Sequence, residues 1–446
     1  MSGVNSSLSE IGIVDIIFEE IQNAKKVISN VVHTTNLIRS RTFSYYTKGE
    51  VFLKLENLQK TGSFKLRGAY YKIKKLLDEA KKNGAIQEFM EKGVVAASAG
   101  NHAQGVAFAA MLSGVKSKIV MPVWVTSSKY LATKEYKGEV ILEDMNGPIE
   151  NMNVAIKEAQ RISEVDGAVY IHPYNDKDVI AGQGTLGLEI VCQLKELGIR
   201  PDIIVVPVGG GGLISGISIV LKKTLGDSIK IIGVESDQFP CMLKARESKI
   251  TSELIRAGVK FPMARGATIA DGIAVESPGD LTNEIVNEKR LVDDLVVVSD
   301  DEIALAMFRL LERSKTLVEG AGAASLAAIL SEKIDVKGKN VVAVISGGNI
   351  DPIVLPRIIR RELIREGRLM RINGRIYDIP GDLNRVVSVV ASHGTNIVDI
   401  QCKRYDPKIA PKHVEVEITL EILEKKVLEN ILQELSDRLK YDFRRI

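Results

Sequence analysis

The chain has 446 residues, which is too long for one ordinary domain, so two or three domains are expected. Hydrophobic residues make up 45% of it, enough for buried cores, and the formal net charge of +3 lacks the basic excess of nucleic-acid-binding proteins. The three cysteines, Cys192, Cys241 and Cys402, form no C-x-x-C pair and no disulfide framework, which favours a reducing, cytoplasmic location.

Neither an export signal nor a membrane partner is expected. Met1 to Ser9 is polar and has no basic stretch ahead of an apolar one, unlike a signal peptide. Residues 203–221 carry no charge and are about long enough to cross a bilayer, but Pro207 and four successive glycines interrupt them. A buried strand, a loop and a helix explain this segment better than a membrane span.

From residue 51 to about residue 349, short β-rich runs alternate with amphipathic helical stretches. One such helix is marked by an i, i+3, i+4, i+7 pattern at Leu66, Ala69, Tyr70, Ile73, Leu76 and Leu77. Strands that alternate with helices predict parallel sheets and an α/β fold. The predicted strands are Val51–Leu55, Val94–Ala97, Lys118–Met121, Glu139–Leu142, Ile203–Val208, Lys230–Val234 and Val341–Ile345.

The C-terminal part follows a different pattern. A helix is predicted over 352–367, where arginines alternate with apolar residues as on one solvated helix face. Residues 370–446 then read as βαββαβ, the order of a ferredoxin-like split βαβ unit. Its predicted elements are a strand at Arg371–Tyr377, a helix at Leu383–Ser392, strands at Asn396–Tyr405 and His413–Leu420, a helix at Lys425–Leu439 and a strand at Tyr441–Ile446.

Lys65 is the strongest candidate for a catalytic side chain. It stands in the motif T-G-S-F-K-L-R-G-A, residues 61–69, at a predicted helix start behind a turn of small residues. Schiff-base chemistry needs a lysine that is held rigidly and can lose its proton. Ser63 is expected to cap the first turn, and the positive helix end disfavours the ammonium form. The alternative is an ordinary surface lysine, which this motif disfavours.

A tetraglycine loop, Gly209-Gly210-Gly211-Gly212, lies between a predicted buried strand and a helix opened by Leu213. Glycine amides there can close around a phosphate at the helix N-terminus. Ile214 and Ser215 replace the third glycine of a dinucleotide motif, and the G-K-[ST] of a nucleotide P-loop is missing. The loop therefore predicts a phosphate site of neither type. A flexible linker is the alternative, which the apolar flanks disfavour.

Two further polar turns follow predicted strands. The turn from Ser98 to Asn101 offers amides to an anion, and its Asn side chain can reach a ring hydroxyl; a helix cap without a ligand is the alternative. The hydroxyl of Ser346, placed beside a pyridine nitrogen, would leave that nitrogen largely unprotonated, and such a weak electron sink suits β-elimination. An ordinary strand-end turn is the alternative there. His102 has no triad partner pattern and is predicted to be structural.

In this order, the motifs resemble the threonine/serine dehydratase family of fold type II pyridoxal-phosphate enzymes. The resemblance runs from about Ile21 to Asp351 and includes L-K-L-E-N-L-Q at 53–59, G-Q-G-T at 182–185, G-V-E at 233–235, T-I-A-D-G-I-A-V at 268–275 and Val318-Glu319. It implies a two-lobed fold like that of the tryptophan synthase β subunit, with pyridoxal 5'-phosphate as the cofactor. A smaller lobe at about 60–160 is then inserted in the larger lobe.

The resemblance also assigns residues to roles. Lys65 carries the cofactor, Asn101 meets its ring hydroxyl, Gly209, Gly210, Gly211, Gly212 and Leu213 bind its phosphate, and Ser346 faces its ring nitrogen. Ser98, Ala99, Gly100 and Asn101 hold the substrate carboxylate. Serine racemases of the family have a serine in place of Ala99 as a second acid/base, and alanine cannot donate a proton, so elimination is favoured over racemisation. Relatives with a divalent cation use the Glu of G-V-E and an acidic residue six positions later, where this chain has Cys241, so no metal is predicted.

The C-terminal unit resembles an ACT regulatory domain, because Asp378–Leu383 and His393–Ile397 match the two loops of that domain. The expected organisation is a pyridoxal-phosphate-dependent catalytic region over 1–350, a connecting helix over 351–369 and an ACT domain over 370–446. ACT domains pair and bind amino acids, which implies a homodimer or homotetramer and an amino-acid effector. A ferredoxin-like domain that only oligomerises is the alternative.

The resemblance implies an ammonia-lyase that converts L-threonine to 2-oxobutanoate and ammonia by α,β-elimination of water, with some activity on L-serine. An L-serine dehydratase or racemase is a second interpretation. A non-catalytic amino-acid sensor that kept the fold is an alternative of another class. The resemblance leaves open the preference between threonine and serine, the effector, and the choice between isoleucine biosynthesis and catabolism.

Overall fold

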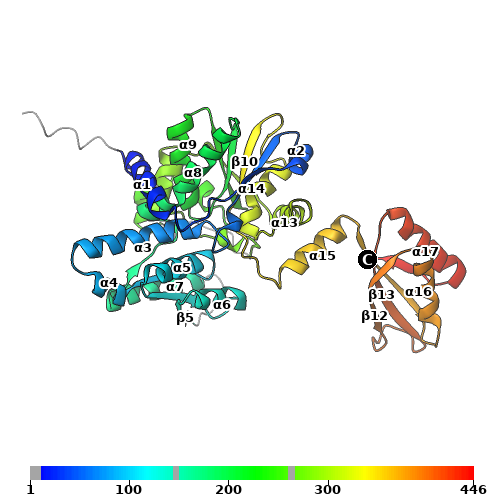
Figure 1. Ribbon diagram of the computed structural model, residues 1–446. Helices are drawn as coiled ribbons and strands as arrows, with labels where there is room; N and C mark the ends of the chain where they lie inside the picture. The colour runs from blue at the N-terminus through cyan, green and yellow to red at the C-terminus, as the bar shows by residue number, and fades with distance from the viewer. Residues whose placement is uncertain (1–11, 144–149, 260–266) are drawn as a thin grey trace, which may run out of the picture. The chain divides into compact units, whose positions relative to one another are not determined.

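A computed structural model of the chain describes residues 12–143, 150–259 and 267–446 (Figure 1). Met1–Ser9, which the sequence predicts not to be a signal peptide, lies outside the described residues. The chain divides into two compact units, Met1–Pro352 and Ile353–Ile446.

The larger lobe of the first unit is built on a six-stranded sheet with the order β1-β2-β10-β7-β8-β9. All neighbours in it run parallel except the edge strand β1, which pairs antiparallel with β2 through Ile38 and Leu53. The strands are β1 (Leu37–Arg39), β2 (Glu50–Leu55), β7 (Ile203–Pro207), β8 (Lys230–Ser236), β9 (Asp294–Val298) and β10 (Asn340–Ile345). The described helices of this lobe are α1 (Ile13–Ile28), α2 (Arg41–Thr47), α3 (Lys65–Lys82), α8 (Lys177–Glu196), α9 (Gly212–Leu225), α10 (Cys241–Glu247), α11 (Ser252–Arg256), α12 (Asp280–Asn283), α13 (Asp300–Ser314) and α14 (Gly320–Leu330), with single turns at η1 (Glu56–Leu58), η2 (Asp271–Ile273) and η3 (Glu284–Glu288).

The smaller lobe has a four-stranded parallel sheet with the order β5-β4-β3-β6. Its strands are β3 (Val94–Ala97), β4 (Ser117–Pro122), β5 (Glu139–Glu143) and β6 (Val169–Tyr170), and its helices are α4 (Ile86–Lys92), α5 (Asn101–Ser113), α6 (Ser127–Glu135) and α7 (Glu150–Asp166). Helix α3 packs against both α5 of this lobe and α8 of the larger one (Figure 1). One apolar cluster, with Leu66, Ala107 and Ile180 among its buried members, therefore runs through both lobes.

The predicted α/β architecture with two parallel-sheet lobes is confirmed, and each predicted strand of this unit appears within two residues of its expected bounds. Three strands, β1, β6 and β9, were not predicted. The uncharged segment 203–221 forms β7, a glycine loop and most of α9. Among the described residues, no helix is long and apolar enough to cross a membrane.

The second unit contains α15 (Leu355–Arg365), β11 (Leu369–Tyr377), α16 (Asp382–Ser392), β12 (Asn396–Lys403), β13 (His413–Glu421), α17 (Lys425–Leu439) and β14 (Phe443–Arg445). Its antiparallel sheet has the order β12-β13-β11-β14, so the predicted βαββαβ unit is confirmed. Helices α16 and α17 cover the core with Val390 and Ile431. On α15, Ile358 and Glu362 are buried while the arginines at 357, 360, 361 and 365 are exposed, as predicted for a solvated face.

Candidate active site

Lys65 opens helix α3, and the turn before it is held by the loop that follows β10 rather than by a helix cap. Ser63 pairs with Gly347 in an isolated bridge, and the Phe64 amide donates to the carbonyl of Ser346 at 3.2 Å. The N-cap residue is Phe64 and has no side-chain cap, while the buried Ser63 hydroxyl has no partner among the described residues. The predicted Ser63 cap is therefore wrong, because the bridge to Gly347 fixes this residue just outside the helix.

The Lys65 side chain is partly buried. Its Nζ donates to the carbonyl of Pro173 at 2.9 Å. That carbonyl is held in place by His172, whose Nδ1 accepts the amides of Tyr174 at 3.2 Å and Asn175 at 2.8 Å. Burial lowers the pKa of Lys65 to about 8, and the charge of Glu319 opposes this shift. A neutral, nucleophilic amine is therefore accessible near neutral pH.

Asn101 connects three loops that are far apart in the sequence. Its Nδ2 donates to Glu319 Oε1 at 2.5 Å, and its Oδ1 accepts from Asn349 Nδ2 at 2.7 Å. Asn349 Nδ2 also donates to the carbonyl of Thr61 at 2.8 Å, just before the Lys65 turn. The start of α5, the loop after β10 and the turn before α3 are thus tied together, and Asn101 has a fixed orientation.

The glycine loop makes a close-walled cradle beside the same segment that holds Lys65. A Cβ added to Gly210 would overlap the ring of Tyr174, which directly follows the Pro173 carbonyl. Gly211 has φ +93°, and a Cβ there would lie 2.6 Å from Met242 Cε, so glycine is needed for both conformation and space. The backbone amides of residues 209–213 donate to no other described residue. Unpaired amides at the start of a helix are able to bind an anion.

Ser346 directly follows β10, next to the turn that precedes Lys65, and is 3% exposed. Its carbonyl accepts a hydrogen bond from the Phe64 amide, while its hydroxyl makes no hydrogen bond with another described residue. Amides for an anion, an amine that can be neutral and an unpaired hydroxyl are the groups that pyridoxal 5'-phosphate needs for its phosphate, its aldehyde and its ring nitrogen. The donor set therefore fits this cofactor.

The turn from Ser98 to Asn101 is half-buried and borders open space. The amide of Gly100 donates to Ser98 Oγ at 3.1 Å, and a Cβ added to Gly100 would meet no atom within 4 Å. The hydrogen bond from Asn349 to Asn101 places the end of this turn beside the loop after β10, and Gly100 faces open space. Ala99 offers a methyl group there and no acid or base.

Glu319 is the main site residue to which the sequence assigned no role, although it is part of the Val318-Glu319 motif. It precedes α14, is only 4% exposed, and directs its carboxylate to Asn101 instead of capping its own helix. Burial raises its pKa to about 7, the charge of Asp271 adds to this, and Lys129, Asn101 and Lys65 oppose it. A carboxylate directly before a helix of small residues was the available sequence signal, but its partner lies 218 residues away.

Replacing Glu319 with glutamine is expected to lower the pKa of Lys65 further below about 8, because the carboxylate is the charge that opposes the effect of burial. The measurement is the pH dependence of Lys65 acylation in the cofactor-free protein, followed on its peptide by mass spectrometry. The midpoint should fall in Glu319→Gln and stay unchanged in Glu139→Gln, on an exposed position of β5. An unchanged or higher midpoint in Glu319→Gln would contradict the assignment.

Two other groups near these motifs have structural partners. His102 is buried, its Nε2 lies 2.8 Å from the carbonyl of Ile171, and burial together with the charge of Lys65 lowers its pKa to about 3. Glu235 accepts the amides of Met242 and Leu243, both at 2.8 Å, and burial raises its pKa to about 8. Within the part of the chain that the structure describes, no group of three or more His, Cys, Asp or Glu side chains could hold a metal ion.

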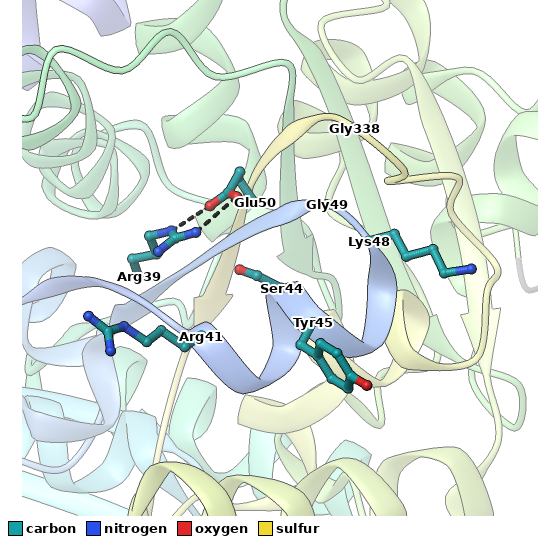
Figure 2. A pocket seen from close by; sticks show the side chains of 8 residues that line it. All are labelled: Arg39, Arg41, Ser44, Tyr45, Lys48, Gly49, Glu50 and Gly338. Atoms are coloured by element: carbon teal, nitrogen blue, oxygen red, sulfur yellow. Dashed lines mark hydrogen bonds and ion pairs between the residues drawn. The ribbon is translucent and has the colours of Figure 1, made fainter.

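A surface pocket of about 500 Å³ lies elsewhere, around β1, α2 and the start of β2 (Figure 2). It contains no predicted site residue. Arg39 is paired with Glu50, while Arg41 and Lys48 point in opposite directions. Its charges therefore do not converge on one ligand.

Comparison with known proteins agrees with this geometry. A family model described as pyridoxal-phosphate dependent enzyme matches residues 28–347. An L-threonine ammonia-lyase from Thermotoga maritima is 44% identical over 416 residues, which cover 93% of this chain and 96% of that protein. The Escherichia coli K12 protein named L-threonine dehydratase catabolic TdcB is 43% identical over 339 residues, covering 75% of this chain and 94% of that protein.

Solved structures give the same result for the fold. The processed form of threonine deaminase isoform 2 from Solanum lycopersicum has a TM-score of 0.65 at 32% identity, over 78% of this chain and 88% of that one. A maize serine racemase has a TM-score of 0.64 at 34% identity, over 78% of this chain and 98% of that one. The match over residues 28–347 spans Lys65, the glycine cradle and Ser346. The chain therefore belongs to the family of pyridoxal-phosphate dependent enzymes.

Proposed function

We propose that the chain is an L-threonine ammonia-lyase that forms 2-oxobutanoate and ammonia, with some activity on L-serine. The observation that carries the proposal is a partly buried lysine of lowered pKa, found together with a close-walled glycine loop of unpaired amides and a serine hydroxyl that no described residue pairs with. The relative from Thermotoga maritima, named for this activity, aligns over 96% of its own length.

In this proposal each residue has a defined task. The amides of residues 209–213 bind the cofactor phosphate, Asn101 orients the ring hydroxyl, and Ser346 leaves the ring nitrogen largely unprotonated. The bound cofactor supplies an electron sink for negative charge at the substrate Cα. Lys65 holds the cofactor at rest; its freed amine then takes the Cα proton as a general base. The half-buried turn from Ser98 to Asn101 receives the substrate carboxylate.

Elimination is favoured over racemisation by Ala99. A racemase needs a second acid/base on the opposite face of the substrate, and a methyl group cannot fill that role. The likeness to a maize serine racemase at 34% identity keeps serine dehydration or racemisation as a second candidate. A non-catalytic amino-acid sensor is the candidate of another class, and the presence of Lys65, Asn101 and Ser346 together counts against it.

The decisive experiment mixes purified protein and pyridoxal 5'-phosphate with L-threonine and, separately, with L-serine. Faster release of 2-oxobutanoate from threonine is expected, measured as keto acid. Keto acid from serine alone would make the protein a serine dehydratase. No keto acid from either substrate, despite a visible band of lysine-bound cofactor, would favour a racemase or a sensor.

We also propose a catalytic region over 1–350, a connecting helix over 351–369 and an ACT domain over 370–446 that binds an amino-acid effector and pairs chains into a homodimer or homotetramer. The βαββαβ order of β11 to β14 supports this organisation. Helix α15, proposed as the connecting helix, falls within the C-terminal compact unit, Ile353–Ile446. Isoleucine or valine binding would indicate a role in branched-chain biosynthesis.

Three unpaired cysteines support a cytoplasmic setting.

A further inference from the structure

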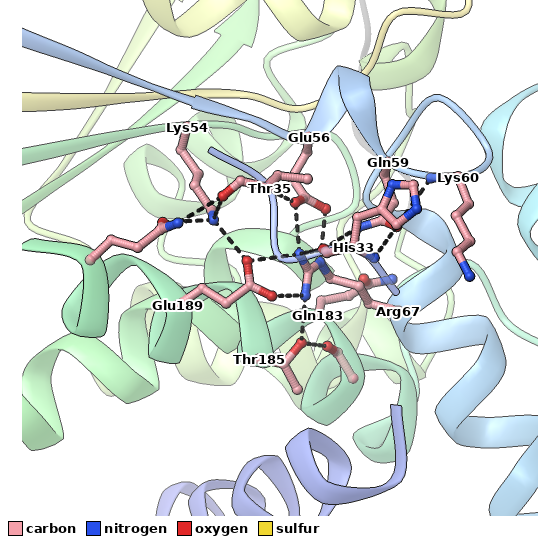
Figure 3. Close-up of polar contacts among 12 residues, drawn as sticks. His33, Thr35, Lys54, Glu56, Gln59, Lys60, Arg67, Gln183, Thr185 and Glu189 are labelled. Atoms are coloured by element: carbon pink, nitrogen blue, oxygen red, sulfur yellow. Dashed lines mark hydrogen bonds and ion pairs between the residues drawn. The ribbon is translucent and has the colours of Figure 1, made fainter. Parts of the chain in front are cut away.

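A cluster of four charged side chains is buried directly behind the start of α3 (Figure 3). The side chains of Lys54, Glu56 and Arg67 are fully buried, and that of Glu189 is 12% exposed. Two cations face two carboxylates, so the cluster has no net charge. Burial lowers the pKa of Arg67, but the adjacent Glu56 and Glu189 outweigh this and raise it overall, so the guanidinium stays charged.

Arg67 is the centre of the cluster and uses all three of its nitrogens. Nε and Nη2 donate to the two oxygens of Glu56 at 2.8 and 2.7 Å, and Nη1 and Nη2 donate to those of Glu189 at 2.7 and 3.0 Å. Nη1 also reaches Thr185 Oγ1 and Nη2 the carbonyl of His33, both at 3.3 Å. A planar fork with two bidentate partners fixes both distance and angle.

The partners of Arg67 come from separate elements. Glu56 belongs to η1, Glu189 and Thr185 to α8, and His33 to the segment before β1. Lys54 at the end of β2 joins the same network, since its Nζ donates to Glu189 at 2.7 Å and to the carbonyl of Thr35 at 2.7 Å. The cluster therefore fixes the position of the first turn of α3 relative to β2, α8 and the segment before β1.

Two glycines bring α3 and α8 into backbone contact at the same level. A Cβ on Gly182 would lie 2.5 Å from the Cα of Gly68, and the Gly68 amide donates to Gln183 Oε1 at 3.3 Å. Lys65 and Arg67 lie in this same first turn, so a shift of the guanidinium would move the Lys65 backbone with it.

Buried ion pairs of this kind contribute little net stability compared with apolar side chains of similar volume, whereas their geometry specifies one arrangement. Arg67 is two residues from Lys65, so a fixed geometry at Arg67 also fixes the backbone of Lys65. This matters for the reaction because a Schiff-base lysine must meet its partner in one orientation.

We propose that Arg67 is a positioning residue for Lys65: through its paired contacts with Glu56 and Glu189 it fixes the first turn of α3 and hence the direction and environment of the lysine amine. The proposal rests on the proposed function only in taking Lys65 as the cofactor lysine. Loss of the bound-cofactor band in Lys65→Ala tests that assumption separately.

The test compares full-length Arg67→Lys and Arg67→Met with Lys72→Met as a matched control. Lys72 lies on the same helix and is held by Asp176 and Asp178, at 2.8 and 2.9 Å. Three readouts are taken: the pH midpoint of Lys65 acylation without cofactor, the wavelength of the bound-cofactor band and the dissociation constant of pyridoxal 5'-phosphate. Arg67→Met is expected to move the midpoint and band and to weaken cofactor binding about 10-fold or more, with Arg67→Lys in between.

The control should leave all three readouts unchanged within about twofold, since Lys72 shares no partner with Arg67 and Asp178 keeps its ion pair with Lys75 at 2.7 Å. If Arg67→Met fails to fold, the charge-balanced double variant Arg67→Met with Glu56→Gln replaces it, because it leaves no unpaired charge in the cluster. Should that fail as well, Thr185→Val, which removes one long contact of the guanidinium, carries the test. Wild-type midpoint, band and affinity in the folded variant, or equal changes in Lys72→Met, would overturn the proposal.

Discussion

Replacing Lys65 with alanine is expected to abolish release of keto acid from L-threonine and to remove the visible band of lysine-bound cofactor. The variant loses both the amine that holds the cofactor and the general base for the Cα proton, and a general base alone contributes about 10² to 10⁴-fold. The fold should survive, because the bridge between Ser63 and Gly347 does not involve this side chain. The measurements are keto-acid release, the absorption spectrum and circular dichroism.

Lys60→Ala is the matched control for this experiment. Lys60 lies five positions earlier and is exposed, so both turnover and the cofactor band should remain at the wild-type level. Turnover that persists in Lys65→Ala would exclude Lys65 as the cofactor lysine and with it the proposed mechanism.

The sequence predicted buried strands well because their signals are local. Val94–Ala97 is recovered with its exact bounds, since an apolar run is closed by Gly93 and by the polar turn at Ser98. Two of the three strands that were missed lack one of these signals: β6 has only two residues, and β1 is a three-residue edge strand with two exposed positions. In β9 the run Leu295–Val298 is flanked by aspartates and could have been recognised.

The functional residues also divide into those with a local sequence signal and those defined by long-range contacts. Lys65, the glycine loop and Ser346 stand out because small or polar residues follow apolar strands or precede helices. Asn349 and Glu319 could not be assigned, because their roles come from contacts with Asn101 across 248 and 218 residues of chain. The carbonyl of Pro173 carries no side-chain signal at all. Tertiary contacts thus decide what holds the reactive groups, while local sequence decides which groups they are.

Replacing Gly210 with alanine is expected to weaken binding of pyridoxal 5'-phosphate by about 100-fold, measured by titrating the cofactor band. The added Cβ would overlap the ring of Tyr174, so either the ring or the loop must move. A charge-assisted hydrogen bond contributes about 1.5–3 kcal/mol, so misplacing two amides accounts for an effect of this size. Turnover at saturating cofactor should fall less than affinity.

The cause can be separated from a general loss of stability by a double-mutant cycle with Tyr174→Ala, which removes the ring carbons that an added Cβ would overlap. Once the ring is removed, the Cβ of Ala at position 210 has room, so Gly210→Ala should cost much less affinity in the Tyr174→Ala background than in the wild type. An equal loss in both backgrounds would show that the ring is not what requires glycine. A wild-type dissociation constant in Gly210→Ala would show that the loop amides do not bind the phosphate, because the loop could not keep its geometry beside an intact Tyr174.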